Sequence, residues 1–280
     1  MATHEVLFAR SRQHHWSGAG ALSIKTFVNG EASYEVGAAR YLVDEQHYLI
    51  LNQGQEYTVT VDAPAPLESF CLFFAPGFAE EVYYSATTPT VRLLDQPVAP
   101  TRTPLQFFEK TYAHDEILSP NLVQLRAWYP HRQSERSWMQ EQLHSIMQQL
   151  LTVHQAAQHE METIPALRAA TREELYRRLH CARDYIAASY SQPLTLEMMA
   201  SVACLSPNHF LRTFKQLFHQ TPHQYLTEQR LRQAQKLLRT SDQSVTTICL
   251  AVGFESVGSF SWLFRRQIGS SPEQFRRAKR

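Results

Sequence analysis

Glycine is scarce in this chain: there are nine glycines in 280 residues. The glycine-rich motifs that cradle a phosphate or expose a catalytic serine are missing, since the sequence holds no GxGxxG, no Walker A motif and no GxSxG. These absences exclude the common dinucleotide- and nucleotide-binding loops and the nucleophile turn of the serine hydrolases.

Cysteine is also sparse, and the four cysteines form no CxxC pair. They are Cys71, Cys181, Cys204 and Cys249. This spacing excludes a zinc ribbon or a disulfide framework and favours a reducing compartment. No apolar run approaches the ~20 residues that a membrane span needs, and the first residues do not resemble a signal peptide. We therefore expect a cytoplasmic protein with no membrane partner.

Charge divides the chain into two halves, although the net charge is only +1. Residues 1–165 contain 10 Lys and Arg against 18 Asp and Glu, a balance of −8. Residues 166–280 contain 17 against 8, a balance of +9. We predict an acidic domain over 1–165 and a basic domain over 166–280. The basic half indicates either a polyanionic partner or a solvated basic surface.

The acidic half reads first as strands and then as helices. Short apolar or alternating stretches are separated by turn signals at Asn29-Gly30, Gln53-Gly54 and 64–66. These stretches cover residues 22–28, 48–51, 57–61 and 70–74. Such spacing favours a barrel or a sandwich. After Pro130 the apolar period becomes helical over 138–153, and a further helix is predicted over 171–190.

The basic half contains an internal repeat with a shift of 50 residues. The paired positions are Val202 with Val252, Ser206 with Ser256, Phe210 with Phe260, Phe214 with Phe264, Lys215 with Arg265, Phe218 with Ile268, Pro222 with Pro272, Gln224 with Gln274 and Tyr225 with Phe275. Because there are only two copies of a long unit, the pattern indicates a duplicated module and not a solenoid.

Each copy has the pattern of a helix-turn-helix, over about 196–217 and 245–268. A short amphipathic helix and a tight turn lead to Ser206 or Ser256, both good N-cap residues, and then to a second helix. The second helices turn phenylalanines inward. Their opposite faces carry Asn208, Leu211, Arg212 and Lys215 in copy one, and Gly258, Ser261, Trp262 and Arg265 in copy two. Faces of this kind fit the major groove of DNA.

A long helix joins the two copies. Thr221 to Gln224 form a capping box, and the helix that follows has about 18 residues, or roughly 27 Å at ~1.5 Å per residue. That length is of the order of the ~34 Å between successive major grooves on one face of DNA.

These features resemble the AraC-type family of bacterial transcriptional regulators. The matching residues are Ile248-Cys249, Gly253-Phe254, Ser256, Phe260, Phe264, Gly269, Ser271-Pro272 and Phe275-Arg276. The resemblance covers roughly 179–280, and the acidic half more loosely resembles the family's cupin-like domain. It implies an α+β multidomain fold: an N-terminal cupin-like β-barrel followed by helices, then an all-α domain with two helix-turn-helix units joined by a long helix.

The resemblance also implies which residues contact DNA. Base contacts are expected from Asn208, Leu211, Arg212, Val257, Gly258, Ser261 and Trp262, and phosphate contacts from Ser206, Lys215, Ser256, Arg265 and Arg266. Arg212 is the strongest candidate, as a reader of guanine or a phosphate clamp. Trp262 departs from the family pattern and either reads DNA shape or packs on a neighbouring helix. His219 stands where the family commonly has glycine.

The expected partners are double-stranded DNA, a small-molecule effector, a second copy of the chain and RNA polymerase. The sequence leaves open whether dimerisation uses the barrel or the helices near 134–163. It also leaves the effector site unassigned, since Tyr34, Tyr41, Tyr57, Phe70 and Phe73 either line a pocket or fill the barrel. On the resemblance, the chain is expected to activate transcription and not to be an enzyme.

Two alternatives stay open. One is a dimeric DNA-binding protein without an effector. The other is a cupin-type metalloenzyme fused to a nucleic-acid-binding module. Metal-binding cupins use His-x-His, which is missing here, and the adjacent His14 and His15 would face opposite sides of a strand. We expect no metal site, no cofactor and no catalytic residue.

Overall fold

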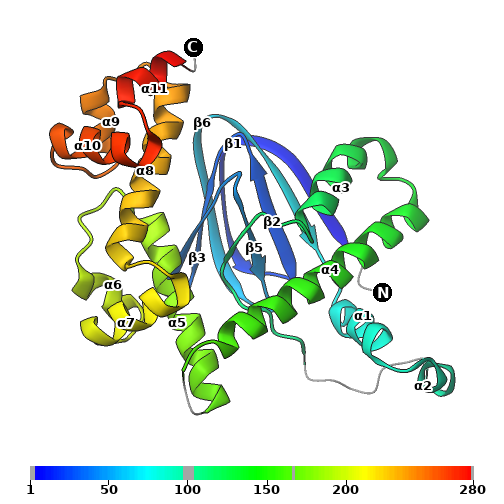
Figure 1. Cartoon of the computed structure of the whole chain (residues 1–280). Helices are drawn as coiled ribbons and strands as arrows, with labels where there is room; N and C mark the ends of the chain where they lie inside the picture. The colour runs from blue at the N-terminus through cyan, green and yellow to red at the C-terminus, as the bar shows by residue number, and fades with distance from the viewer. Residues whose placement is uncertain (1–3, 97–103, 166–167, 279–280) are drawn as a thin grey trace. The chain divides into compact units, whose positions relative to one another are not determined.

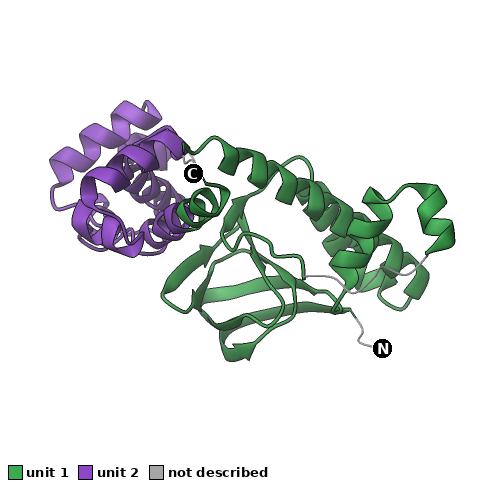
Figure 2. Cartoon of the chain, turned by 90° about the horizontal axis from the view of Figure 1, so that it is seen from below, with its two compact units in different colours: residues 1–177 green, residues 178–280 purple. Residues whose placement is uncertain are grey.

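The computed structural model describes residues 4–96, 104–165 and 168–278. The chain forms two compact units, residues 1–177 and 178–280 (Figure 2). The predicted boundary between 165 and 166 falls at residues 166–167, which lie outside the described residues. Helix α5 (Ala169–Ala188) begins in the first unit and ends in the second.

The first unit is built on an antiparallel sheet that curls into a nearly closed barrel (Figure 1). Its strands are β1 (Glu5–Ala19), β2 (Ser23–Val28), β3 (Ala32–Val36), β4 (Ala39–Val43), β5 (His47–Leu51), β6 (Glu56–Phe73) and β7 (Thr111–Ala113). They pair in the order β4-β3-β6-β2-β5-β7, and β1 pairs with β6. Strand β4 also contacts β5 and β7, which closes the curl.

Strands β2 and β5 and the second half of β6 are largely buried on both faces, so they contribute to two cores. Ile24 and Leu72 belong to the core between the sheet and the helices. Phe27, Tyr34 and Tyr57 belong to the barrel interior. Because side chains alternate along a strand, every second residue of β2 and β6 points into the barrel.

Two strands predicted from the sequence are one strand in the structure. The turn expected at 64–66 does not separate 57–61 from 70–74, because β6 runs through it. Strand β1 pairs with β6 up to Asp62 and again from Leu67, with a register shift between Ser11 and Gln13. The prolines at 64 and 66 lie in this unpaired stretch, where the missing N–H breaks no ladder hydrogen bond.

Helices pack on the outer face of the sheet: α1 (Phe78–Thr87), α3 (Ser119–Arg132) and α4 (Arg136–Glu162). Helix α2 (Thr90–Asp95) buries no residue. The helix predicted over 138–153 is confirmed as α4, whose Leu143, Met147 and Leu150 pack into the outer core. The predicted change to helix after Pro130 is wrong, since α3 begins at Ser119 and contains Pro130 near its end.

The second unit is all helical and follows the predicted modules. After α5 come α6 (Leu196–Val202), α7 (Pro207–Phe218), α8 (Pro222–Thr240), α9 (Val245–Ala251), α10 (Val257–Ile268) and α11 (Pro272–Ala278). The predicted fold class, a cupin-like barrel with helices followed by two helix-turn-helix units joined by a long helix, is confirmed.

The turn between the two helices is one residue longer in the second module than in the first. The second helices α7 and α10 are 50 residues apart, but the first helices α6 and α9 are 49 apart. The turn hydrogen bonds agree: the amide of Leu205 donates to Ala200 O, and that of Phe254 to Cys249 O, both at 3.0 Å. The predicted pairing of Val202 with Val252 is therefore wrong by one residue.

Both modules have the same aromatic core. Phe214 lies edge-on to Tyr225 at 6.0 Å, and 50 residues later Phe264 lies edge-on to Phe275 at 5.5 Å. Such pairs stabilise a core beyond the area that they bury. No helix among the described residues has the length and apolar character required to cross a membrane.

Candidate nucleic-acid interface

Helix α7 presents its predicted ridge to solvent. Asn208, Arg212 and Lys215 are exposed and Leu211 is half-buried, while Phe210 and Phe214 on the other face are fully buried. Ser206 is the N-cap residue, but its side chain makes no capping hydrogen bond. Ser206 is itself exposed at the start of this helix, and helix N-termini in general favour anions.

Helix α10 presents the equivalent ridge. Gly258, Arg265 and Arg266 are exposed, and Trp262 has 60% of its surface exposed. The Arg266 guanidinium lies 5.2 Å from the Trp262 ring centroid, so the two side chains support one another one turn apart.

Two further residues of this ridge, Val257 and Ser261, are half-buried. Ser256 caps the helix, since its hydroxyl accepts a hydrogen bond from the Ser259 amide at 3.4 Å. A shallow hollow lies beside Trp262, lined by Gly258, Ser259, Trp262 and Leu263. The structure thus places the residues predicted for DNA contact on two helix faces that are open to a partner. Their roles as base or phosphate contacts stay predictions.

Helix α8 holds the two modules. Its 19 residues span about 28 Å, and the capping box predicted at its start is present, with Thr221 and Gln224 bonded to each other's amides. Leu226 is buried near its beginning, whereas Leu231 and Leu238 enter the core of the second module. The two modules therefore lie near opposite ends of one helix (Figure 1).

Arg230 is a positioning residue that the sequence did not reveal, because it was indistinguishable from the other basic residues of the long helix. Its guanidinium donates to Tyr190 O and Gln192 O, both at 2.8 Å, and lies 5.6 Å from the Phe254 ring centroid. Burial lowers the pKa of Arg230 below its usual value, partly offset by Glu255. Arg230 therefore ties the segment before α6 to the turn of the second module.

Gly253, in that turn, has φ 90°. A Cβ at this position would lie 2.8 Å from Ser191 O and 3.0 Å from the Arg230 guanidinium. Glycine is required here by both the backbone conformation and the space. The second helix of each module ends at a residue with positive φ, but the residue type differs. Gly269 after α10 has φ 86°, and His219 after α7 has φ 57°. His219, which stands where the family commonly has glycine, therefore adopts the left-handed conformation.

The barrel interior contains a cavity of about 440 Å³. Of the five aromatic residues left open by the sequence, Tyr34, Tyr57 and Phe73 line it. Tyr41 is instead packed in the interior core, and Phe70 faces the helices. The lining also includes Lys25, which the sequence did not single out. Among the described residues, no group of three or more His, Cys, Asp or Glu side chains is placed to hold a metal ion.

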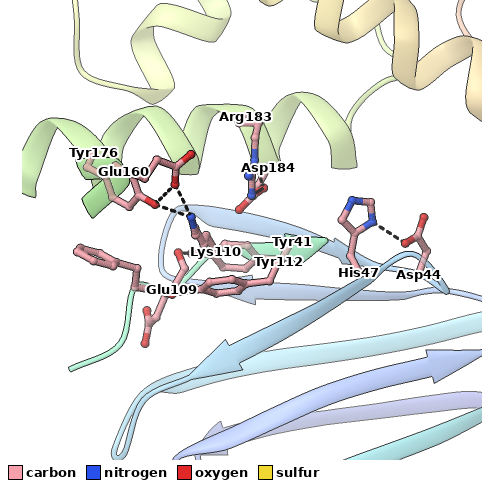
Figure 3. A network of polar contacts seen from close by, with 11 residues as sticks. Tyr41, Asp44, His47, Glu109, Lys110, Tyr112, Glu160, Tyr176, Arg183 and Asp184 are labelled. Carbon is pink, nitrogen blue, oxygen red and sulfur yellow. Dashed lines mark hydrogen bonds and ion pairs between the residues drawn. The ribbon is translucent and has the colours of Figure 1, made fainter. Parts of the chain in front are cut away.

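A polar cluster fastens the first half of α5 to the barrel unit (Figure 3). Lys110 Nζ donates to Glu160 Oε2 at 3.2 Å, and to the Tyr176 hydroxyl at 2.5 Å. The Tyr176 hydroxyl donates in turn to Glu160 Oε2 at 2.5 Å. Since Tyr176 is on α5, the helix that leads to residues 178–280 is anchored on the barrel side of the division.

Two exposed ridges on a duplicated helix-turn-helix, carried by the basic half of the chain, are the arrangement expected of a DNA-binding domain. Residues 199–278 match the family model described as a helix-turn-helix domain. The resemblance to the AraC-type family is confirmed over this part of the chain.

Known proteins similar to this chain match it over that domain. The HTH-type transcriptional regulator AlkR of Acinetobacter baylyi is 38% identical over 91 residues, 32% of this chain and 30% of AlkR. The HTH-type transcriptional activator RhaS of Escherichia fergusonii is 36% identical over 102 residues, 36% of this chain and 37% of RhaS. This chain thus spans about a third of the length of the curated relatives that it matches.

Among solved structures, the DNA-binding domain of AdpA in complex with a target DNA is 37% identical. The match covers 36% of this chain and 91% of that chain, with a TM-score of 0.35.

Proposed function

We propose that this protein is a sequence-specific transcriptional activator whose N-terminal domain binds a small-molecule effector and forms a homodimer. The observation that carries the proposal is the pair of solvent-exposed ridges on α7 and α10, at equivalent positions of two modules. The names of the relatives support the regulatory role, and that of RhaS supports activation. RNA polymerase is the partner through which an activator acts.

On each ridge, some side chains contact bases and others contact phosphates. Arg212 and Asn208 on α7 supply hydrogen-bonding groups for base edges, and Leu211 suits a thymine methyl. Trp262 and Gly258 on α10 have few such groups and read methyls and groove shape. Ser206, Lys215, Ser256, Arg265 and Arg266 hold phosphates, which fixes the register without reading sequence.

The cavity in the barrel supports an effector-responsive protein over one that only dimerises. A barrel filled by side chains has no room for a ligand, whereas about 440 Å³ is within the range of small-molecule sites. Helix α5 joins the two units, and its anchored half offers a route by which occupancy changes DNA binding. Such regulation requires the effector to bind the two arrangements with different affinity.

Replacing Arg212 with alanine is expected to weaken binding to the cognate DNA by about 1–3 kcal/mol and to relax the preference at one base pair. The side chain is exposed, so the protein should stay folded. Binding isotherms for the cognate duplex and its single-base variants measure both effects. Unchanged affinity would place the reading face elsewhere.

Replacing Lys215 or Arg265 with alanine is expected to weaken binding to all DNA sequences by a similar factor. Each change removes about one phosphate contact, so the slope of log K against log salt should become shallower by about 0.9. Titrations at several salt concentrations give the slope. A change in base preference would show that the residue reads bases instead.

The fragment 166–280 is expected to bind DNA and to lose any response to effector. It contains both modules and α8, and it begins before α5. Gel-shift titration of the fragment beside the full chain tests the proposed function. If the fragment folds, as judged by circular dichroism, and binds no DNA, the assignment of DNA binding to this unit is contradicted.

A further inference from the structure

A single lysine ammonium lies inside the barrel. Lys25 is on β2, on the same face as Phe27 and opposite to Ile24, and only 2% of its surface is exposed. Lysine is among the residues least often buried without a charged partner. Its position on the lining of the cavity therefore requires an explanation.

Lys25 has few partners for its charge. Its Nζ donates to the Tyr57 hydroxyl at 3.1 Å and lies 3.7 Å from the Phe73 ring centroid. Within the described residues no carboxylate forms an ion pair with Lys25. The carboxylate of Glu5, which is exposed, acts on it only through a longer-range electrostatic attraction. An ammonium has three N–H donors, so Tyr57 leaves donor capacity on a buried cation.

Most of the other lining residues are apolar or aromatic, and Glu5, His14 and Ser69 are the polar exceptions. Trp16 lies 4.8 Å from Tyr57, and Tyr34 lies 5.7 Å from it, measured between ring centroids. Gly20 makes room for this wall, because a Cβ there would lie 2.6 Å from the Tyr57 ring. Leu7 and Trp16 line the cavity and are about two-fifths exposed, so the cavity reaches solvent beside them.

We propose that this cavity binds a small organic monoanion, whose carboxylate accepts hydrogen bonds from Lys25 Nζ and whose apolar body packs against Tyr57, Phe73 and Trp16. The inference rests on the proposed function, since it names the chemical class of the effector.

The charge balance of the site favours one negative charge. Lys25 is the one lysine or arginine among the lining residues, which also include the carboxylate of Glu5, and the domain has a net charge of −8, so a dianion would bring a second negative charge without a cationic partner. A neutral polyol would place its hydroxyl groups against the aromatic walls and would leave the Lys25 ammonium without an anion. A carboxylate on an apolar body satisfies both parts of the cavity.

Several titratable groups face Lys25, and they predict how binding depends on pH. They are Glu5 and His14 from β1, Tyr34 from β3, and Tyr57 and Cys71 from β6. Burial raises the pKa of Cys71 and raises that of Tyr57 to about 12, so neither becomes charged near neutral pH. Burial also lowers the pKa of Lys25 to about 8. The anion should therefore bind best below about pH 8 and lose affinity above it.

The test compares matched acids and amides on the full-length chain. The probes are 4-phenylbutyrate with 4-phenylbutanamide, and octanoate with octanamide, titrated by tryptophan fluorescence and by thermal shift. At pH 7 a carboxylate is expected to bind about tenfold more tightly than its amide. Its affinity should fall by about tenfold per pH unit above about pH 8.

Three variants make the result specific. Lys25→Met should remove the preference for the acid and its pH dependence. Lys110→Met removes a buried ammonium that lies outside the cavity and should keep both. Tyr57→Phe keeps the aromatic ring and removes the hydroxyl that competes for Lys25 Nζ, so it should preserve the preference for the acid over the amide. It serves as a second test if Lys25→Met does not fold.

Equal binding of acid and amide would overturn the proposal. So would an unchanged preference in Lys25→Met, its loss in Tyr57→Phe, or the failure of both carboxylates to bind. None of these readouts involves DNA. Sequence-specific DNA binding without anion binding would leave the regulatory function in place and remove only the anionic effector.

Discussion

Replacing Phe264 with alanine is expected to lower the free energy of unfolding of the DNA-binding unit by about 3–5 kcal/mol. The side chain is fully buried, and it contacts Phe260 at 5.6 Å and Phe275 at 5.5 Å between ring centroids. It joins α10 to the core formed by α8 and α9. Denaturant unfolding followed by far-ultraviolet circular dichroism measures the loss, and DNA affinity should fall with it.

Trp262 on the same helix is the matched control. It is also a large aromatic residue, but it lies on the exposed ridge, two positions before Phe264. Trp262→Ala is expected to change stability by no more than about 0.5 kcal/mol while reducing DNA affinity. If Trp262→Ala unfolded the unit and Phe264→Ala did not, the two faces of α10 would be assigned the wrong way round.

Replacing Lys25 with methionine is expected to raise the stability of the barrel unit by about 2–4 kcal/mol at pH 7. The pKa of Lys25 falls from 10.5 to about 8 because burial disfavours the charged form. The native state therefore carries a cost that is fully present below about pH 8, where the ammonium is charged in both states. Methionine removes the charge at similar volume.

The same argument predicts the pH dependence. Between about pH 8 and 10.5 the unfolded state binds a proton at Lys25 that the native state does not, so wild-type stability rises with pH in this window. The advantage of Lys25→Met should therefore shrink by about 2 kcal/mol between pH 7 and about pH 9.5. Thermal unfolding of both proteins at the two pH values measures it. A lower stability of Lys25→Met at pH 7 would show that the ammonium is well satisfied in the barrel.

The helical unit was predictable from the sequence because its signals are local. Pro207 and Pro222 start helices, Thr221 forms a capping box, and the buried phenylalanines recur at helical spacing. The one-residue difference between the two turns was not visible, since a shift of 50 aligns the second helices and hides an insertion before them. The exposed ridges of α7 and α10 follow from helical geometry alone.

The barrel was less predictable because its strands depend on distant partners. Strand β1 is largely exposed, so it shows no clear alternation, and the prolines of β6 looked like a turn. Lys25 is the clearest example of a residue whose position the local sequence pattern does not predict. An alternating strand places a lysine in water if the sheet is open on one side, and inside the protein only if the sheet closes. Closure depends on β4 meeting β5 and β7, which no local pattern records.

The most direct test of two reading helices is selection of duplex DNA from a randomised library by the full-length protein. The expected result is a half-site with two short motifs about 10 base pairs apart, in successive major grooves on one face of the duplex, and a homodimer selects two such half-sites. Arg212→Ala should relax base preference within one motif only, and Trp262→Ala within the other only. A single motif, or the loss of both motifs from either change, would contradict the account.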